Sequence, residues 1–322
     1  MRILSGIQPS GILHLGNYFG AMREHVRLAA EHDAFYFIAD YHALTTVQDA
    51  ATMRGFRFSA AADYLAIGLD PEHTTLFSQV DVPEVTELAW ILSTLTPMPM
   101  MENAHAYKDK IAHGLTASLG LVAYPALMAA DILIYDSDGV PVGNDQKQHI
   151  EITRDLAGKF NRTYGETLRL PRDIIKKDVA IVPGIDGEKM SKSYGNDIPI
   201  FLEGKPLKKR VMSIVTDSKG VEDPKDPDTC NAFAIWRLFA NADEVAEMRE
   251  RYTAGGMGYG DVKKDLLARI NDHFADARTR RRELDDKPDY VWDVLEDGGR
   301  RARNAAHAVM DRVRAACGLS RS

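Results

Sequence analysis

The first half of the chain alternates short apolar segments with longer helical patterns, and few folds accommodate that alternation. Strands are predicted for residues 2–7, 35–39, 74–78 and 140–142. Helices are predicted to begin near Leu15 and to cover residues 52–67, 85–95, 119–135 and 146–160. Strands and helices that alternate in this way form a parallel sheet with helices on both faces. The predicted fold class is therefore α/β, with a doubly wound parallel sheet.

Polar residues and glycines follow each predicted strand. They fall at residues 8–11, 40–42, 79–81 and 143–145. In open α/β sheets, ligands bind beyond the carboxyl ends of the strands. The four segments are therefore predicted to converge on one cleft.

The second half of the chain has a different character. A loop rich in Gly, Lys and Ser covers residues 183–197, a polar segment covers 217–228, and helical patterns continue to the end. A chain of 322 residues is also large for a single hydrophobic core. We expect an α/β domain over residues 1–189 and a mainly helical domain over residues 190–322, whose last helix packs back on the α/β domain.

The composition is that of an ordinary soluble globular protein, with 45% apolar and 27% charged residues. Cys230 and Cys317 are the only cysteines and lie far apart, which argues against a disulfide framework and favours a reducing, cytoplasmic compartment. No HxxxH or CxxC pattern occurs, so we expect no metal held by the protein. The chain starts directly in a strand pattern, so we expect no signal peptide. Residues 119–135 are nearly long enough to cross a bilayer, but Pro125 and Asp131 lie among them, so we expect a buried helix and no membrane span.

The formal net charge of −7 argues against a general nucleic-acid binder. Binding to RNA would need a local basic patch, and the candidates lie late in the chain. They are Arg278, Arg280, Arg281, Arg282, Arg300, Arg301 and Arg303. The alternative is a solvated helix face, balanced by the carboxylates of Glu283, Asp285 and Asp286.

A glycine-containing turn follows the first predicted strand, with the sequence QPSGILHLGN at residues 8–17. Gly11 and Gly16 allow the backbone to approach a ligand closely. The helix that follows offers free N–H groups and a positive dipole end, which suit a phosphate. His14 can donate to a phosphate or ribose oxygen. A simple turn between strand and helix is the alternative.

The second constellation is KMSKS at residues 189–193. Lys189 and Lys192 can grip pyrophosphate oxygens through charge-assisted hydrogen bonds. A mobile loop lets that grip tighten only during the reaction. The alternative is a solvated basic loop.

Asp131 interrupts the apolar pattern of residues 119–135, and a buried carboxylate is costly without a partner. Helical spacing puts it on one face with Tyr124 and Met128. An acceptor on an apolar wall suits an aromatic ligand with one N–H, while a helix cap or a salt bridge to an arginine is the alternative. His42 and His149 read equally well as core histidines.

The two constellations together resemble the paired signatures of class I aminoacyl-tRNA synthetases. KMSKS matches that family's consensus, while Asn17 stands in place of a histidine, a change common in the tryptophan and tyrosine branch. The strings SGIQPSG (5–11), YPALMAADIL (124–133), VPVGNDQKQH (140–149) and TDS (216–218) resemble bacterial tryptophanyl-tRNA synthetases. This resemblance covers residues 2–319. It implies a Rossmann-like catalytic domain, and a helical domain that binds the tRNA anticodon.

The resemblance also implies roles for individual residues. For ATP binding it implies Gln8, Pro9, Ser10, Gly16, Asn17, Gly143, Asn144, Asp145, Ile181, Lys189, Met190, Ser191, Lys192 and Ser193. For tryptophan binding it implies Asp131, which accepts the indole N–H, with Met128, Tyr124, Gln146, His42 and Gln8. The implied catalytic residues are His14, Asn17, Lys110, Lys189 and Lys192. Leu4, Tyr41 and Asn144 depart from the residues usual in the family, and put the fine shape of the pocket in doubt.

The implied reaction activates L-tryptophan with ATP and then transfers it to tRNA(Trp). The attacking carboxylate is already ionised, so charge on the phosphates matters more than a general base. We expect this charge from His14, Lys110, Lys189, Lys192 and the Mg²⁺ that accompanies ATP. The family further implies a homodimer.

Three alternatives share parts of this pattern. A tyrosyl-tRNA synthetase has the same fold and both signatures, but the string at 124–133 does not resemble its pocket. An adenylate-forming nucleotidyltransferase would not need the helical domain. A regulatory paralogue without activity would not need intact signatures at residues 14–17 and 189–193.

Overall fold

A computed structural model describes residues 1–9, 11–102, 118–143, 146–175 and 182–320. Its centre is a sheet of five strands in the order β3-β2-β1-β4-β5, and every pair of neighbours is parallel. The strands are β1 (Arg2–Ile7), β2 (Asp33–Ile38), β3 (Thr74–Ser78), β4 (Gly139–Val142) and β5 (Arg172–Ile175). In this order β2 and β3 lie on one side of β1, and β4 and β5 lie on the other, so the strand order reverses between β1 and β4. Open α/β sheets bind their ligands at such a point.

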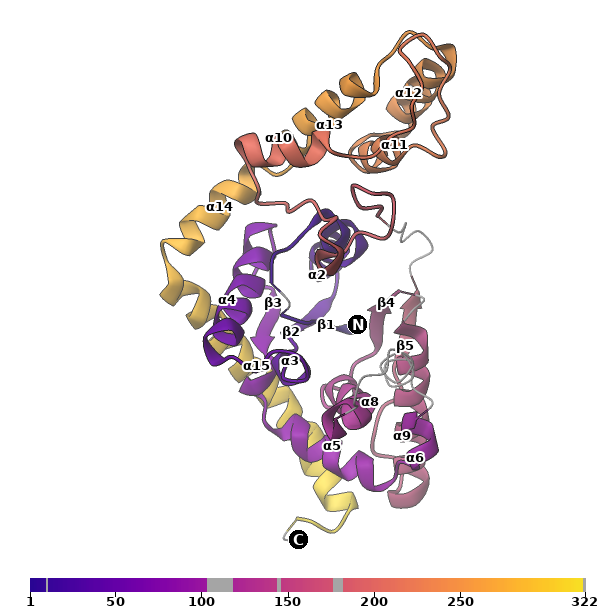
Figure 1. Cartoon of the computed structure of the whole chain (residues 1–322). Coiled ribbons are helices and arrows are strands. Elements are labelled where there is room, and N and C mark those ends of the chain that lie inside the picture. The colour runs from indigo at the N-terminus through magenta and orange to yellow at the C-terminus, as the bar shows by residue number, and fades with distance from the viewer. Residues whose placement is uncertain (10, 103–117, 144–145, 176–181, 321–322) are drawn as a thin grey trace.

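Helices connect the strands and cover both faces of the sheet (Figure 1). They are α1 (Leu15–Asn17), a π-helical turn η1 (Tyr18–Met22), α2 (Arg23–Ala29), α3 (Asp40–Ala43), α4 (Ala50–Ala66), the 3-10 turn η2 (Gln79–Asp81), α5 (Glu84–Thr94), α6 (Met98–Glu102), α8 (Leu119–Leu133) and α9 (Lys147–Tyr164). Side chains cap two of the longer helices: Asp49 accepts from the Thr52 backbone N–H at the start of α4, and Ser118 accepts from Leu121 at the start of α8.

Alternate residues of one strand enter separate apolar cores, one on each face of the sheet. Ile3 belongs to the core that includes Tyr36, whereas its neighbour Leu4 belongs to the core that includes Phe35 and Phe37. Successive side chains of a strand point to opposite faces, so two cores require helices on both faces. The predicted doubly wound α/β fold is therefore confirmed.

The rest of the chain is helical and leaves the sheet before returning to it (Figure 1). After a short turn η4 (Lys192–Tyr194), the helices are α10 (Gly204–Met212), α11 (Asn231–Trp236), η5 (Arg237–Phe239), α12 (Ala242–Ala254), α13 (Tyr259–His273), α14 (Ala275–Asp285) and α15 (Pro288–Ala316). α14 packs on α4, and α15 packs on β3. The fit is close at Gly298, where a Cβ atom would lie 1.8 Å from the Leu76 carbonyl oxygen.

The predicted helices and strands agree with the observed boundaries to within a few residues, whereas the short helices α3 and α6 and the strand β5 were not predicted. Its four residues, Arg172–Ile175, lie at the edge of the sheet and show no alternation that separates them from a loop. Residues 119–135 form the buried helix α8 and the turn after it, as predicted. Within the described ranges, no helix is long and apolar enough to span a membrane.

Candidate active site

The turn after β1 and the loop that carries both predicted lysines lie against each other. We call residues 189–193 the lysine loop. The Leu15 backbone N–H donates to Ile198 at 3.0 Å, and Ile200 donates back to Leu13 at 3.1 Å. The Gly16 N–H points to the Met190 sulfur at 3.3 Å, and Met190 itself is buried. The two signatures, about 175 residues apart in the sequence, therefore form one surface.

Lys192 reaches the glycine turn directly. Its Nζ lies 5.3 Å from the centroid of the Phe56 ring, and a Cβ atom on Gly11 would come within 2.2 Å of it. Gly11 has a φ of +103°, which L side chains rarely adopt. A side chain at this position would therefore both strain the backbone and displace the ammonium group.

The backbone of the lysine loop is held from beneath by Asn196. Its Oδ1 accepts from the Ser191 N–H at 2.7 Å, and its Nδ2 donates to the Lys189 carbonyl at 3.1 Å. The hydroxyls of Ser191 and Ser193 lie 2.9 Å apart. The side chains of Lys189, Lys192 and Ser193 are exposed, so the loop presents two cations and a hydroxyl to the solvent side of the cleft.

His14 and Asn17 form the start of the helix in the first signature. The His14 backbone N–H donates to Asn17 Oδ1 at 3.2 Å, and the His14 ring is buried. Burial lowers the pKa of His14, although Asp197 opposes the change. The ring is therefore mainly neutral at pH 7 in this environment, and a neutral ring can still donate a hydrogen bond.

Asp131 lies at the centre of a buried cluster. His42 Nε2 is 2.8 Å from Asp131 Oδ2, and Gln79 Nε2 lies 2.7 Å from Oδ1 and 2.9 Å from Oδ2. Burial raises the pKa of Asp131, and the hydrogen bonds from His42 and Gln79 oppose the rise. The partners of Asp131 are thus a histidine and an amide rather than an arginine or a helix end.

Gln79 was not predicted as a site residue. Its only signal in the sequence was its place in the polar segment after β3, which was predicted to face the cleft. The side chain is 1% exposed. The convergence predicted for residues 40–42 and 79–81 is confirmed by the contacts of Tyr41, His42 and Gln79.

Aromatic and thioether groups complete the wall beside Asp131. The Tyr124 ring lies edge-on to His42 at 5.1 Å and to His149 at 5.4 Å between centroids. The Tyr124 hydroxyl is 3.6 Å from the Met128 sulfur. Burial and the Asp131 carboxylate both raise the pKa of Tyr124, so its hydroxyl is a donor at neutral pH.

Other predicted site residues lie directly after strands of the sheet or at the start of a helix. Gln146 immediately precedes α9, one helical turn before His149. Gln8 is exposed and Pro9 is buried directly after β1, and Gly143 follows β4. Five predicted residues lie outside the described residues: Ser10, Lys110, Asn144, Asp145 and Ile181.

The arginines of α14, offered above as an RNA-binding surface, instead hold this helix to the rest of the chain. Their partners are the Ile200 carbonyl for Arg278, the Ala66 carbonyl for Arg280, the buried Asp63 for Arg281 and Glu203 for Arg282. The pairing with a carboxylate offsets the charge of Arg281 and Arg282, whereas a bond to a neutral carbonyl leaves the charge of Arg278 and Arg280 in place. Arg280 and Arg282 are nevertheless exposed, so an RNA-binding surface on α14 stays a prediction.

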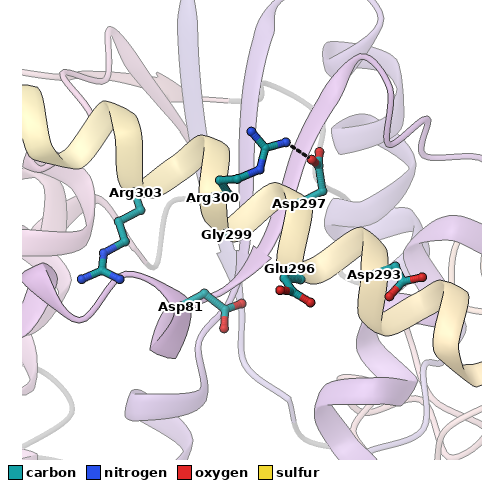
Figure 2. A pocket seen from close by; sticks show the side chains of 7 residues that line it. All are labelled: Asp81, Asp293, Glu296, Asp297, Gly299, Arg300 and Arg303. Carbon is teal, nitrogen blue, oxygen red and sulfur yellow. Dashed lines mark hydrogen bonds and ion pairs between the residues drawn. The ribbon is translucent and has the colours of Figure 1, made fainter.

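The arginines of α15 give the same result. Arg300 and Arg301 pair with Asp297, and Arg303 pairs with Glu84. The groove beside them has a volume of about 590 Å³, and Asp81, Asp293 and Glu296 line it as well (Figure 2). An acidic groove repels RNA phosphates, so the solvated, balanced helix face describes α15 better.

Comparisons with known proteins agree with this geometry. A model of the family described as tRNA synthetases class I (W and Y) matches residues 1–275. The chain therefore belongs to the class I tRNA synthetases. It is 54% identical to the tryptophan–tRNA ligase of Fusobacterium nucleatum subsp. nucleatum over 99% of this chain and 98% of that protein. It is 53% identical to the tryptophan–tRNA ligase of Rhodopirellula baltica, over 99% of this chain and 100% of that protein.

A solved structure gives the same placement. The crystal structure of tryptophanyl-tRNA synthetase from Campylobacter jejuni, complexed with ADP and tryptophane, has a TM-score of 0.92 and 48% sequence identity. The match covers 99% of this chain and 100% of that chain. Within the class I family, the relatives therefore place this chain among the tryptophanyl-tRNA synthetases.

Proposed function

We propose that the chain is a tryptophan–tRNA ligase, which converts L-tryptophan and ATP to tryptophanyl-adenylate and pyrophosphate and then transfers tryptophan to tRNA(Trp). The observation that carries the proposal is the joining of the two signatures beside a buried carboxylate pocket. A phosphate-binding surface and an amino-acid pocket in one cleft are what adenylate formation requires.

In the first step, the tryptophan carboxylate oxygen attacks the α-phosphorus of ATP, and the bond to the pyrophosphate oxygen breaks. Lys189 and Lys192 neutralise the charge that moves onto pyrophosphate. The neutral His14 ring donates a hydrogen bond, and in the described part of the chain its buried Nδ1 has no protein partner. Mg²⁺ belongs to the ATP substrate in this proposal: phosphate oxygens and water hold it, and it adds positive charge at the leaving group. Lys110, Asn144 and Asp145 keep the ATP-binding roles that the family resemblance implies.

The amino-acid pocket uses Asp131 as the acceptor for the indole N–H. A carboxylate offers about four acceptor positions. Among the described residues, Oδ2 accepts from His42 and Gln79 and Oδ1 accepts from Gln79 only, so one acceptor position on Oδ1 is left for the indole N–H. Met128 and Tyr124 supply the apolar wall, and the Tyr124 hydroxyl and Gln146 bind the polar end of tryptophan.

The decisive test uses a tryptophan analogue in which sulfur replaces the indole nitrogen, so that only the donor is lost. We expect wild type to prefer tryptophan by about 10⁴ in kcat/KM, because the analogue leaves a buried acceptor unpaired. Asp131→Ala should lower the rate with tryptophan and shrink that ratio. Equal use of both substrates by wild type would refute the pocket assignment. Pyrophosphate exchange with each amino acid in turn separates this proposal from tyrosine activation and from an inactive paralogue.

The tRNA surface is proposed to include α10. Lys205, Lys208 and Lys209 are exposed and share one helical face, while Leu207 and Val211 are buried on the opposite face. The helix carries no acidic residue. It is also tied to the active site, because Arg210 pairs at 3.1 Å with Asp197, the residue after the Asn196 that supports the lysine loop.

Charge reversal tests this surface. Lys205→Glu together with Lys208→Glu should weaken tRNA charging and flatten its dependence on salt, because two phosphate contacts are lost. Pyrophosphate exchange, which needs no tRNA, should stay at the wild-type rate. Arg154→Glu changes the charge of an exposed residue on α9 and serves as the control. An equal fall in both reactions would mean that α10 only supports the fold.

We also propose that two copies of the chain form a dimer. Trp90 on α5 and Leu119 on α8 are 72% and 81% exposed, and α8 packs on both α5 and α6. Large apolar side chains that gather on one surface mark interfaces. Trp90→Glu should convert a dimer to a monomer in light scattering, whereas Tyr290→Glu, at a position on α15 that is 47% exposed, should not. A wild-type monomer would exclude this part of the proposal.

The setting of the protein is proposed to be the cytoplasm, with a catalytic domain of residues 1–189 that Lys192 of the lysine loop completes, and with anticodon binding in residues 190–322. Cys230 and Cys317 are both free thiols, which suits a reducing compartment. α10 to α13 lie away from the sheet, where they have room for an extended RNA (Figure 1).

A further inference from the structure

The orientation of Gln79 is imposed from outside the tryptophan pocket. Its Oε1 accepts from the Tyr41 backbone N–H at 3.0 Å. An amide that accepts at its oxygen must present its NH₂ group on the other side, and that group faces Asp131. The Tyr41 N–H therefore decides which end of Gln79 meets the carboxylate.

Asp40 holds the same backbone in place. Its Oδ1 accepts from the Tyr41 N–H at 3.0 Å and from the Val80 N–H at 3.1 Å. The Tyr41 N–H lies in the turn after β2, and the Val80 N–H lies in the turn after β3, next to Gln79. One carboxylate therefore joins the two turns. Loss of this joint would release the turn that carries Gln79.

Arg57 keeps Asp40 ionised. Its Nε lies 2.9 Å from Asp40 Oδ2, in an ion pair whose geometry is not that of a hydrogen bond. Burial raises the pKa of Asp40 to about 6, and Arg57 opposes that rise. The carboxylate is therefore the main form at pH 7, and it is paired.

The C-terminal helix α15 contacts the arginine of this ion pair. The Arg57 guanidinium lies 5.6 Å from the centre of the Trp292 ring on α15. Further along α15, a Cβ atom on Gly299 would lie 2.6 Å from Asp81 Cβ, so the helix presses on the η2 turn that begins with Gln79. Contacts thus run from α15 through Arg57 and Asp40 to the Tyr41 backbone N–H, and from there through Gln79 to Asp131.

We propose that Asp40 and Arg57 are positioning residues for substrate specificity: they fix Gln79, and through it the carboxylate that reads the indole N–H. This inference rests on the proposed function, because it assigns a purpose to the pocket named there. Neither side chain touches the substrate. They act by fixing the orientation of the Asp131 carboxylate. Their loss therefore affects the reaction of the substrate that donates to Asp131, which is tryptophan.

The experiment compares kcat/KM for tryptophan and for the sulfur analogue in pyrophosphate exchange. Asp40→Asn and Arg57→Met should each reduce the preference for tryptophan about tenfold, the effect of one well-placed hydrogen bond. The double variant should lose no more than either single variant, because both act through one pair. Arg57→Lys, which keeps the charge, should restore part of the preference.

Asp33→Asn is the matched control. It removes an exposed ion pair between Asp33 and Arg2 at the start of β2, whereas Asp40 follows the end of β2. It should keep the wild-type preference. If Asp40→Asn and Arg57→Met slow both substrates alike, the pair has only a structural role and the inference is wrong. If wild type itself shows no preference, or Asp131→Ala keeps the preference, the proposed function fails instead. Should Asp40→Asn not fold, the Arg57→Met and Arg57→Lys pair decides the matter alone.

Discussion

Around Asp131 the functional side chains are buried and bonded to one another, whereas the side chains of Lys189 and Lys192 in the lysine loop are exposed above a backbone held by Asn196. Asp131, His42 and Gln79 hold each other at 2.7–2.9 Å before any substrate arrives. Lys189 and Lys192 extend from a backbone fixed by Asn196. Preformed bonds suit recognition of a neutral N–H that is the same throughout the reaction. Exposed cations suit a charge that appears only in the transition state.

The largest effect that this contrast predicts falls on the lysine loop. Lys189→Ala or Lys192→Ala should lower kcat by about 10²–10³ and change KM for tryptophan little, because the lost charge acts on the departing pyrophosphate. Single-turnover adenylate formation measures this directly. Lys264→Ala, an exposed lysine on α13, is the control. A kcat equal to that of wild type would remove the loop from the mechanism.

For the free energy of unfolding, we expect the larger effect at Asp131 and the smaller effect in the lysine loop. Asp131→Ala leaves the Gln79 amide and the His42 ring buried without their acceptor, and should lower the free energy of unfolding by about 1–3 kcal/mol. The two lysine variants should stay within about 0.5 kcal/mol of wild type, because their side chains are exposed. Urea denaturation measures both. An Asp131→Ala protein as stable as wild type would mean that water replaces the carboxylate at no cost.

A glycine pair sharpens the comparison further. Gly11→Ala should lower kcat/KM for ATP about tenfold or more, because the new Cβ atom displaces the Lys192 ammonium. Gly68→Ala is the matched control: its φ of +105° imposes similar backbone strain, but no atom lies near the new Cβ. Both variants should lose similar stability, and only Gly11→Ala should lose activity. Similar activity losses in both would reduce the Gly11 effect to backbone strain.

The contrast between the two regions also explains which features could be predicted from the sequence and which could not. The β–α alternation and the strings at 8–17 and 189–193 depend on local order, so the sheet could be predicted from the sequence and a phosphate-binding surface could be proposed from it. The role of Gln79 depends on which donor meets its oxygen, and Tyr41 lies 38 positions away. The arginines show the same limit. Arg281 pairs with Asp63, 218 positions earlier, and no pattern of charge along the chain separates a paired arginine from an unpaired one.

The smallest predicted effect concerns pH and His14, which belongs to the phosphate-binding surface but is buried like the Asp131 cluster. Burial lowers its pKa below 6.5, so the charged fraction is under one half at pH 6.5 and falls about tenfold with each further pH unit. If the charged ring were required, activity would fall steeply between pH 6.5 and 8. Because a neutral donor suffices, we expect His14→Gln, which keeps an N–H, to lower the exchange rate without altering the shape of the pH profile by more than about twofold. A wild-type profile that falls tenfold per unit, and a flat one for His14→Gln, would show that the imidazolium is the active form.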